Sequence, residues 1–232
     1  LPLSRGLGDV YKRQVTVSID GTGGTGTEGT DFGTVSDITI SAGSTTGTVS
    51  FDPTDDSVYE GNETAGISVS GVSGGEASES GTQAVTITIT ENESAPTVTL
   101  ATSATSIAEN AGSSLTLTAT LSVATTADVT VALSTSGTAT EGTDYTDGSG
   151  NVDDITISAG STTGTVSFTP TDDSVYEDDE TATIAVSGVS GGSATESGTQ
   201  TVTITIAENE SAPTVTLTTS ATSIAENAGS SL

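Results

Sequence analysis

The chain has 232 residues and is strongly acidic: 31 Asp and Glu residues stand against 3 Lys and Arg, His is absent, and the formal net charge is −28. All three basic residues, Arg5, Lys12 and Arg13, lie in the first fourteen positions, so almost no surface salt bridge can form elsewhere. This charge would repel nucleic acid and an anionic membrane surface, which excludes both as direct partners.

The apolar content is low, with 31% hydrophobic and 3% aromatic residues. Low hydrophobicity with high net charge is a signature of disorder, but the regular alternation described below argues against it. A chain of this charge folds only if the charge is neutralised, which points to cations. Cys is absent, so no disulfide framework exists, and no apolar run is long enough to insert into a membrane.

Residues 1–14 differ in composition from everything that follows, and they lack the apolar segment of a secretory signal. The segment DVYKRQ (Asp9–Gln14) is what the transposon end used in sequencing-library preparation encodes. We therefore expect residues 1–14 to be a non-native leader, a sequencing scar. The alternative is a genuine basic arm.

The rest of the chain is an internal repeat. ENESAPTVTL occurs at Glu91–Leu100 and Glu208–Leu217, and ITISAGSTTGTVSF occurs at Ile38–Phe51 and Ile155–Phe168, both with a spacing of 117 residues. TEGTDF (Thr27–Phe32) matches TEGTDY (Thr140–Tyr145) with a spacing of 113. A period of this size is a domain, not a solenoid repeat. We expect the later part of one module at 15–93, a complete module at 94–210, and the truncated start of a third at 211–232.

The complete module alternates apolar and polar residues with a period of two, and Thr, Val and Ile dominate, as in half-buried strands. Gly, Ser, Asp and Asn fill the connections. This pattern predicts an all-β fold: tandem seven-stranded antiparallel β-sandwich modules of immunoglobulin-like type. The predicted strands are Thr97–Leu100, Leu115–Leu121, Val129–Leu133, Asp154–Ile157, Gly164–Phe168, Thr181–Val186 and Thr199–Ile206.

One short stretch, TDDSVYEDDET (Thr171–Thr181), concentrates six carboxylates, and its twin TDDSVYEGNET lies at Thr54–Thr64. Each follows a strand-like GTVSF run, at Gly47–Phe51 and Gly164–Phe168, so the acids lie on a connection between strands. Crowded carboxylates on a loop are the hard oxygen ligands that Ca²⁺ selects. From the loop alone, a solvated acidic loop is an equally good interpretation.

The order of the motifs resembles the Calx-β domain. IAENAG is followed by GTATEGTDY, then by TPTDDSVYEDDET, and then by a closing strand TVTITIAENE. The resemblance covers residues 15–232. That module occurs in sodium–calcium exchangers, integrin β4, large surface receptors and long bacterial surface proteins. The resemblance implies a seven-stranded sandwich with Ca²⁺ bound at one end.

The resemblance also implies which residues are the metal ligands. The closing cluster departs from the family's usual run of aspartates, because Ala207–Glu210 reads AENE, and the first module has no counterpart of the early glutamate. The ligands implied in the complete module are Glu109, Asp144, Asp172, Asp173, Glu177, Glu180, Glu208 and Glu210, and those in the first module are Asp31, Asp55, Asp56, Glu60, Glu63, Glu91 and Glu93.

An enzyme is not expected, because His and Cys are absent, Lys is absent after the leader, and few aromatics could hold a sugar. We expect a Ca²⁺-binding structural repeat, with neighbouring repeats of the same chain as its partners. The host would be a long extracellular or cell-surface bacterial adhesin, anchored outside this fragment. One alternative is an adhesive module that binds a cell-surface or matrix ligand through Thr-rich faces such as Thr199–Thr205. The other is a Ca²⁺ regulatory sensor of a membrane protein.

Overall fold

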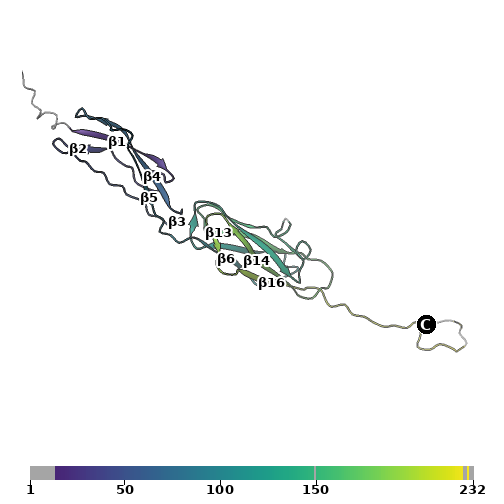
Figure 1. The fold of residues 1–232 in the computed structure, drawn as a ribbon. Coiled ribbons are helices and arrows are strands. Elements are labelled where there is room, and N and C mark those ends of the chain that lie inside the picture. Colours follow the sequence, from purple (N-terminus) through teal and green to yellow (C-terminus); the bar gives the residue numbers. More distant parts are fainter. Residues whose placement is uncertain (1–13, 149, 227–228, 230–232) are drawn as a thin grey trace, which may run out of the picture.

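The computed structural model describes residues 14–148, 150–226 and 229, so the expected leader lies almost wholly outside the described residues. Every regular element in the described ranges is a β-strand, which confirms the all-β prediction. No helix within those ranges has the length and hydropathy needed to cross a membrane. Two modules follow one another along an elongated axis, and an extended segment continues beyond the second (Figure 1).

The second module is a sandwich of two five-stranded sheets, ordered β12-β10-β14-β16-β7 and β11-β13-β8-β6-β15. All seven predicted strands are present. The short strands β7, β9, β11 and β15 are not among them, because two or three residues are too few to show alternation. The strands are β6 (Thr97–Thr102), β7 (Ser106–Ala108), β8 (Leu115–Leu121), β9 (Ala124–Thr125), β10 (Val129–Gly137), β11 (Tyr145–Thr146), β12 (Ile155–Ile157), β13 (Thr163–Pro170), β14 (Glu180–Ser190), β15 (Thr195–Glu196) and β16 (Thr201–Ala207).

The core of this module is built from the inward residues of both sheets. Leu117 on β8 and Ile184 on β14 are fully buried, and both belong to one continuous apolar cluster. Each such side chain contributes about 1.5–3 kcal/mol when it leaves water. The rings of Tyr145 and Phe168 stack with centroids 4.7 Å apart. This pair lies just inside the end of the sandwich where the acidic residues gather.

The first module contributes one four-stranded sheet, ordered β2-β1-β4-β5, over a small core of Phe32, Val35 and Ala65. Its strands are β1 (Val15–Gly24), β2 (Ile38–Ile40), β3 (Val58–Tyr59), β4 (Glu63–Ser73) and β5 (Ala84–Ile89). The strand-like run predicted at Gly47–Phe51 is not a strand. In the second module the same sequence forms β13 by pairing with β8. The described part of the first module has no counterpart of β8, so this backbone lacks a hydrogen-bonding partner.

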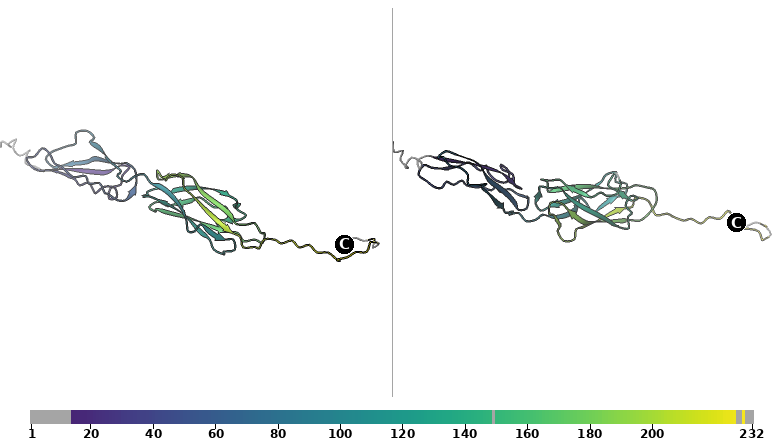
Figure 2. Two further views of the ribbon diagram at one scale, coloured as in Figure 1. Left: turned by 90° about the horizontal axis from the view of Figure 1, so that it is seen from below. Right: turned by 45° about the horizontal axis from the view of Figure 1, so that its top comes forward.

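The modules meet head to tail (Figure 2). β3, on the acidic loop of the first module, pairs in parallel with β9 of the second, with Val58 opposite Ala124 and Tyr59 opposite Thr125. Thr125 is almost fully buried, and Pro96 in the linker is buried as well. The joint therefore has a backbone contact in addition to the short linker between β5 and β6, residues 90–96.

Beyond Glu210 the chain is extended and forms no strand within residues 211–226. Val215 and Leu217 are 97% and 99% exposed, whereas the equivalent Val98 and Leu100 of β6 are 0% and 7% exposed. The same sequence is buried where a β8 partner is present and exposed where none is. The start of a third module at 211–232 stays a prediction.

Candidate metal centre

The acidic residues of each module converge on one end of the sandwich because several elements end there. In the second module β14 begins at Glu180, which pairs with Ile206 near the end of β16. The acidic loop leads directly into β14, and Asp144 immediately precedes β11. We call this end the acidic pole. The first module has the same arrangement around the start of β4 at Glu63.

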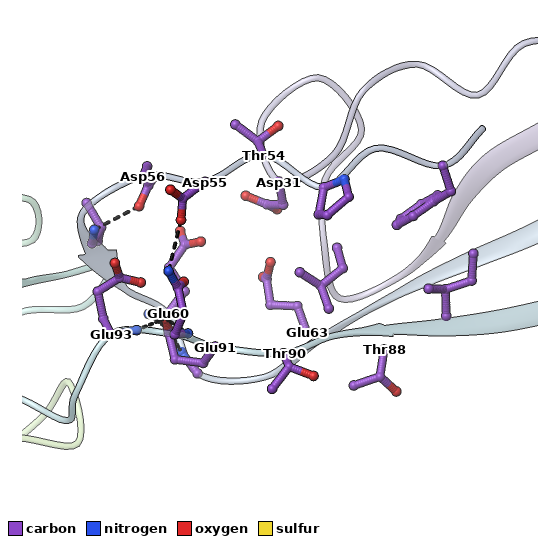
Figure 3. A pocket seen from close by; sticks show the side chains of 17 residues that line it. Asp31, Thr54, Asp55, Asp56, Glu60, Glu63, Thr88, Thr90, Glu91 and Glu93 are labelled. Carbon is purple, nitrogen blue, oxygen red and sulfur yellow. Dashed lines mark hydrogen bonds between the residues drawn. The ribbon is translucent and has the colours of Figure 1, made fainter.

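Three carboxylates form the centre of each pole. Asp144, Glu177 and Glu180 each place one oxygen within 4.8 Å of the others'. Asp31, Glu60 and Glu63 do the same in the first module. These residues occupy equivalent positions in the repeat, so the same trio is built twice. Figure 3 shows Glu63 extending its carboxylate towards Asp31 across the cleft in the first module.

The aspartate of each trio is fixed by its own TEGTD turn. The Thr140 amide donates to Asp144 Oδ2 at 2.5 Å, and the Thr27 amide donates to Asp31 Oδ2 at 2.6 Å. The Asp144 carbonyl in turn accepts from the Thr171 amide at 2.9 Å, which ties the turn to the start of the acidic loop. Asp31 is only 9% exposed. These aspartates therefore face the pole in a fixed orientation before any cation arrives.

A single glutamate anchors the acidic loop in each module. Glu91 Oε2 accepts from the amides of Glu60 and Gly61 at 2.6 and 2.7 Å, and Oε1 accepts from those of Asn92 and Glu93 at 2.9 and 3.0 Å. Burial opposes ionisation, yet these hydrogen bonds hold the pKa of Glu91 at about 2.

Glu208 is the equivalent anchor in the second module. Its Oε2 accepts from the Glu177 amide at 2.5 Å, and its Oε1 accepts from the amides of Asn209 and Glu210, both at 2.7 Å. The hydrogen bond from Glu177, followed by that from Glu210, lowers the pKa of Glu208 to about 2. Both anchors were predicted as metal ligands, and in the structure their oxygens are already engaged by backbone donors.

A second acidic group exists in the second module, where oxygens of Glu109, Glu208 and Glu210 lie within 4.8 Å of one another. Glu109 is only 8% exposed, and burial raises its pKa. Among the described residues, Glu210 Oε2 is a buried side-chain oxygen that has no hydrogen-bond partner. A protonated Glu210 can donate to Glu208, and this contact, followed by burial, raises the pKa of Glu210 to about 7. A proton or a cation beside this oxygen would reduce the repulsion between Glu208 and Glu210.

The trios show the same electrostatic conflict. Burial, followed by the charge of Asp144, raises the pKa of Glu180 to about 7. Burial and then Asp31 likewise raise the pKa of Glu63. Because every Lys and Arg lies in the first fourteen residues, no basic side chain of the modules offsets this repulsion. The geometry favours a bound proton or a bound cation at each trio.

Four other predicted ligands lie at the rim. Asp172 and Asp173 are exposed, and Asp173 Oδ1 accepts from the Val175 amide at 2.6 Å. Asp56 Oδ1 accepts from the Val58 amide at 2.7 Å, and Asp55 Oδ1 accepts from Asn92 Nδ2 at 2.9 Å. None of the four belongs to a trio. With Glu93 they line or border the poles, and in the first module Asp55, Asp56 and Glu93 line a cleft of about 360 Å³ (Figure 3).

Sequence reasoning missed two contributors. Glu141, which is not among the predicted ligands, is half-buried and accepts from the Val152 amide at 2.7 Å and from Thr135 Oγ1 at 2.9 Å. Asp179 Oδ1 accepts from the Glu208 amide at 3.0 Å, as Asn62 Oδ1 accepts from the Glu91 amide at 2.9 Å. The sequence does contain one sign of this role: the position is Asn62 in the first copy and Asp179 in the second, and both side chains offer an acceptor oxygen.

Fold and site together define a tandem β-sandwich module with a carboxylate-lined pole. The model of the Calx-beta domain matches residues 5–93 and 91–210, and the chain belongs to the Calx-beta domain family. This confirms the resemblance noted from the sequence motifs.

Similar solved structures were also found. The apo-form Calx CBD1 domain is 19% identical, with a TM-score of 0.40, and the match covers 50% of this chain and 99% of that one. CBD12 from CALX1.2 is 16% identical, with a TM-score of 0.38, and the match covers 87% of this chain and 89% of that one. The calcium binding domain CBD12 of CALX1.1 is 15% identical, with a TM-score of 0.35, and the match covers 86% of this chain and 89% of that one. The comparison with curated proteins gave no match.

Proposed function

We propose that each acidic pole binds Ca²⁺ and that the modules form a non-enzymatic, calcium-stiffened stalk of an extracellular or cell-surface protein. The observation that carries the proposal is the convergence of three carboxylates in each module. Asp144, Glu177 and Glu180 recur as Asp31, Glu60 and Glu63, each set held within 4.8 Å. Carboxylates that only faced solvent would be expected to separate, because no basic side chain of the modules offsets their mutual repulsion.

The donor set suits Ca²⁺. All the candidate ligands are carboxylate oxygens, and the chain has no His or Cys to favour zinc or a softer metal. Ca²⁺ accepts six to eight oxygens in an adaptable shell, whereas Mg²⁺ requires a smaller octahedron. The trio would supply part of that shell, and the unpartnered Glu210 Oε2 would belong to the shell of a second ion beside Glu109.

A bound cation would act mechanically. It would neutralise the trio and tie the acidic loop to the TEGTD turn and to the first residue of β14. The first module's pole lies at the joint, because Glu60 directly follows β3, which pairs with the next module. Neutralising this pole would remove repulsion at the joint and limit bending. Near-identical copies placed head to tail favour a stalk over a sensor or an adhesive module.

Titration calorimetry on the full chain tests the binding sites. Glu180→Gln should lower the Ca²⁺ affinity of the second module's trio by tenfold or more, or abolish binding there. Glu63→Gln should do the same in the first module, since each variant loses a central ligand. The matched control is Asp154→Asn. Asp154 Oδ1 accepts from the Leu133 amide at 2.9 Å, midway along β10, and Asn preserves that acceptor.

The control should bind Ca²⁺ like the wild type. Equal losses in all three variants would show diffuse charge screening and would overturn the proposal of specific sites.

A further inference from the structure

The two copies of the segment DSVYE have different structures. In the first module Val58 and Tyr59 form β3, and both side chains are half-buried. In the second module the equivalent Val175 and Tyr176 form no strand and are 57% and 36% exposed. An identical sequence is therefore ordered against a neighbour in one copy and exposed in the other.

The neighbour accounts for the difference. Within the part of the chain that the structure describes, β3 is paired only with β9, which belongs to the following module. In the sequence, β9 lies between β8 and β10. Two hydrogen bonds hold it in place: the Thr125 carbonyl accepts from the Gly160 amide at 2.8 Å, and Thr125 Oγ1 donates to the Ala127 carbonyl at 2.6 Å. Residues 211–226 extend beyond the second module and contain no element corresponding to β9. Val175–Tyr176 thus has no equivalent edge to pair with.

The local backbone is already set for the same contact. Gly61 and Asp178 are equivalent positions, and both adopt a left-handed φ, of 76° and 68°. Non-glycine residues rarely adopt a left-handed φ, yet Asp178 does. The turn after the Val–Tyr pair therefore keeps the same backbone conformation in both modules, although glycine is replaced by aspartate. Asp178 also accepts a hydrogen bond from the Tyr176 hydroxyl, which Gly61 has no side chain to offer to Tyr59.

We propose that Val175–Tyr176 is a docking strand for a following repeat. It would pair in parallel with the strand of that repeat that is equivalent to Ala124–Thr125. Each repeat would then carry a donor strand on its acidic loop and an acceptor strand, β9, at its other end. Such a contact is heterologous and propagates in one direction, so it fixes the same geometry at every joint. The inference rests on the array role proposed above but not on Ca²⁺ binding.

The test extends the full chain with a copy of residues 116–210 after Leu232, which occupies the register of Leu115 and so completes a third repeat. Hydrogen exchange is followed in 1 mM Ca²⁺ for the amide of Tyr176, because the amides of Val175 and Glu177 already donate to Asp173 and Glu208 in the parent chain. We expect exchange at least tenfold slower in the extended chain than in the parent. The Tyr59 amide should be protected in both and is the internal control. Equal exchange of the Tyr176 amide in the two chains would overturn the proposal.

Two further arms remove competing explanations. The parent variant Asp178→Gly with Asp179→Asn gives the second loop the sequence of the first, and it should leave the Tyr176 amide fast-exchanging. Protection in that variant would show that local sequence decides, and it would overturn the proposal. So would protection in the parent that rises with protein concentration, because the occupant would then be another chain. Calorimetry of the extended chain reports Ca²⁺ binding separately, so the two proposals can fail independently.

Discussion

Adding Ca²⁺ to the metal-free chain should raise the melting temperature of the second module by an amount on the order of 10 °C. A ligand that binds only the folded state at one hundred times its dissociation constant adds about 2.7 kcal/mol. For a domain of about 100 residues, each kcal/mol shifts the midpoint by about 4 °C or more. The trio and the Glu109–Glu208–Glu210 group exist only when the strands are folded, because residues far apart in sequence form them.

Scanning calorimetry in EDTA and in millimolar Ca²⁺ measures this shift. Mg²⁺ at the same concentration should raise the midpoint less, because its smaller shell fits these carboxylates poorly. NaCl at matched ionic strength controls for screening of the net charge of −28. A midpoint that does not change with Ca²⁺, or that rises equally with NaCl, would contradict the assignment.

In the absence of Ca²⁺, the stability of the second module should fall as the pH rises from about 5 to 8. The pKa of Glu180 is raised in the folded state to about 7, so its stabilising proton is present below the unfolded value and is lost as the pH passes 7. Glu210, whose pKa is also raised to about 7, acts in the same direction. Glu208 has a lowered pKa, so it stabilises the fold fully at any pH above the pKa it has in the unfolded chain. It therefore does not change the stability between pH 5 and 8.

Saturating Ca²⁺ should reverse this slope, because the ion binds the deprotonated carboxylates. Thermal melts across this range measure both slopes. Glu180→Gln should flatten the metal-free profile and raise the midpoint at pH 8 by several degrees, whereas Asp154→Asn should not. If Glu180→Gln instead lowered the midpoint at pH 8 without Ca²⁺, the carboxylate would be a structural hydrogen-bond partner and not a repelled ligand.

Much of the fold follows from local pattern. Runs such as Leu115–Leu121 and Val129–Leu133 show strict alternation, and their inward residues Leu117 and Val131 are fully buried. The pattern fails where pairing depends on a partner strand. GTVSF at Gly47–Phe51 and TVTL at Thr214–Leu217 have the sequence of strands but no strand beside them. Alternation reports the propensity of a segment, and hydrogen-bonding partners decide whether a strand forms.

The composition of the site was predictable, but its internal organisation was not. The predicted residues include both trios, because the resemblance to the Calx-β domain places ligands on the acidic loop and on the TEGTD turn. Sequence spacing could not separate Glu177 and Glu180, which converge on Asp144, from Asp172 and Asp173, which lie at the rim. It also could not show that Glu91 and Glu208 are anchors. That distinction depends on which backbone amides the folded loop turns towards them.

A crystal structure of the full chain grown in millimolar Ca²⁺, with anomalous scattering to identify the ion, tests the central claim most directly. We predict an ion at Asp144, Glu177 and Glu180 and another at Asp31, Glu60 and Glu63, with oxygen distances of about 2.3–2.6 Å. The anchors Glu91 and Glu208 should keep their hydrogen bonds to the backbone. Ordered trios that hold only water under these conditions would contradict the proposal that each module is built around a calcium site.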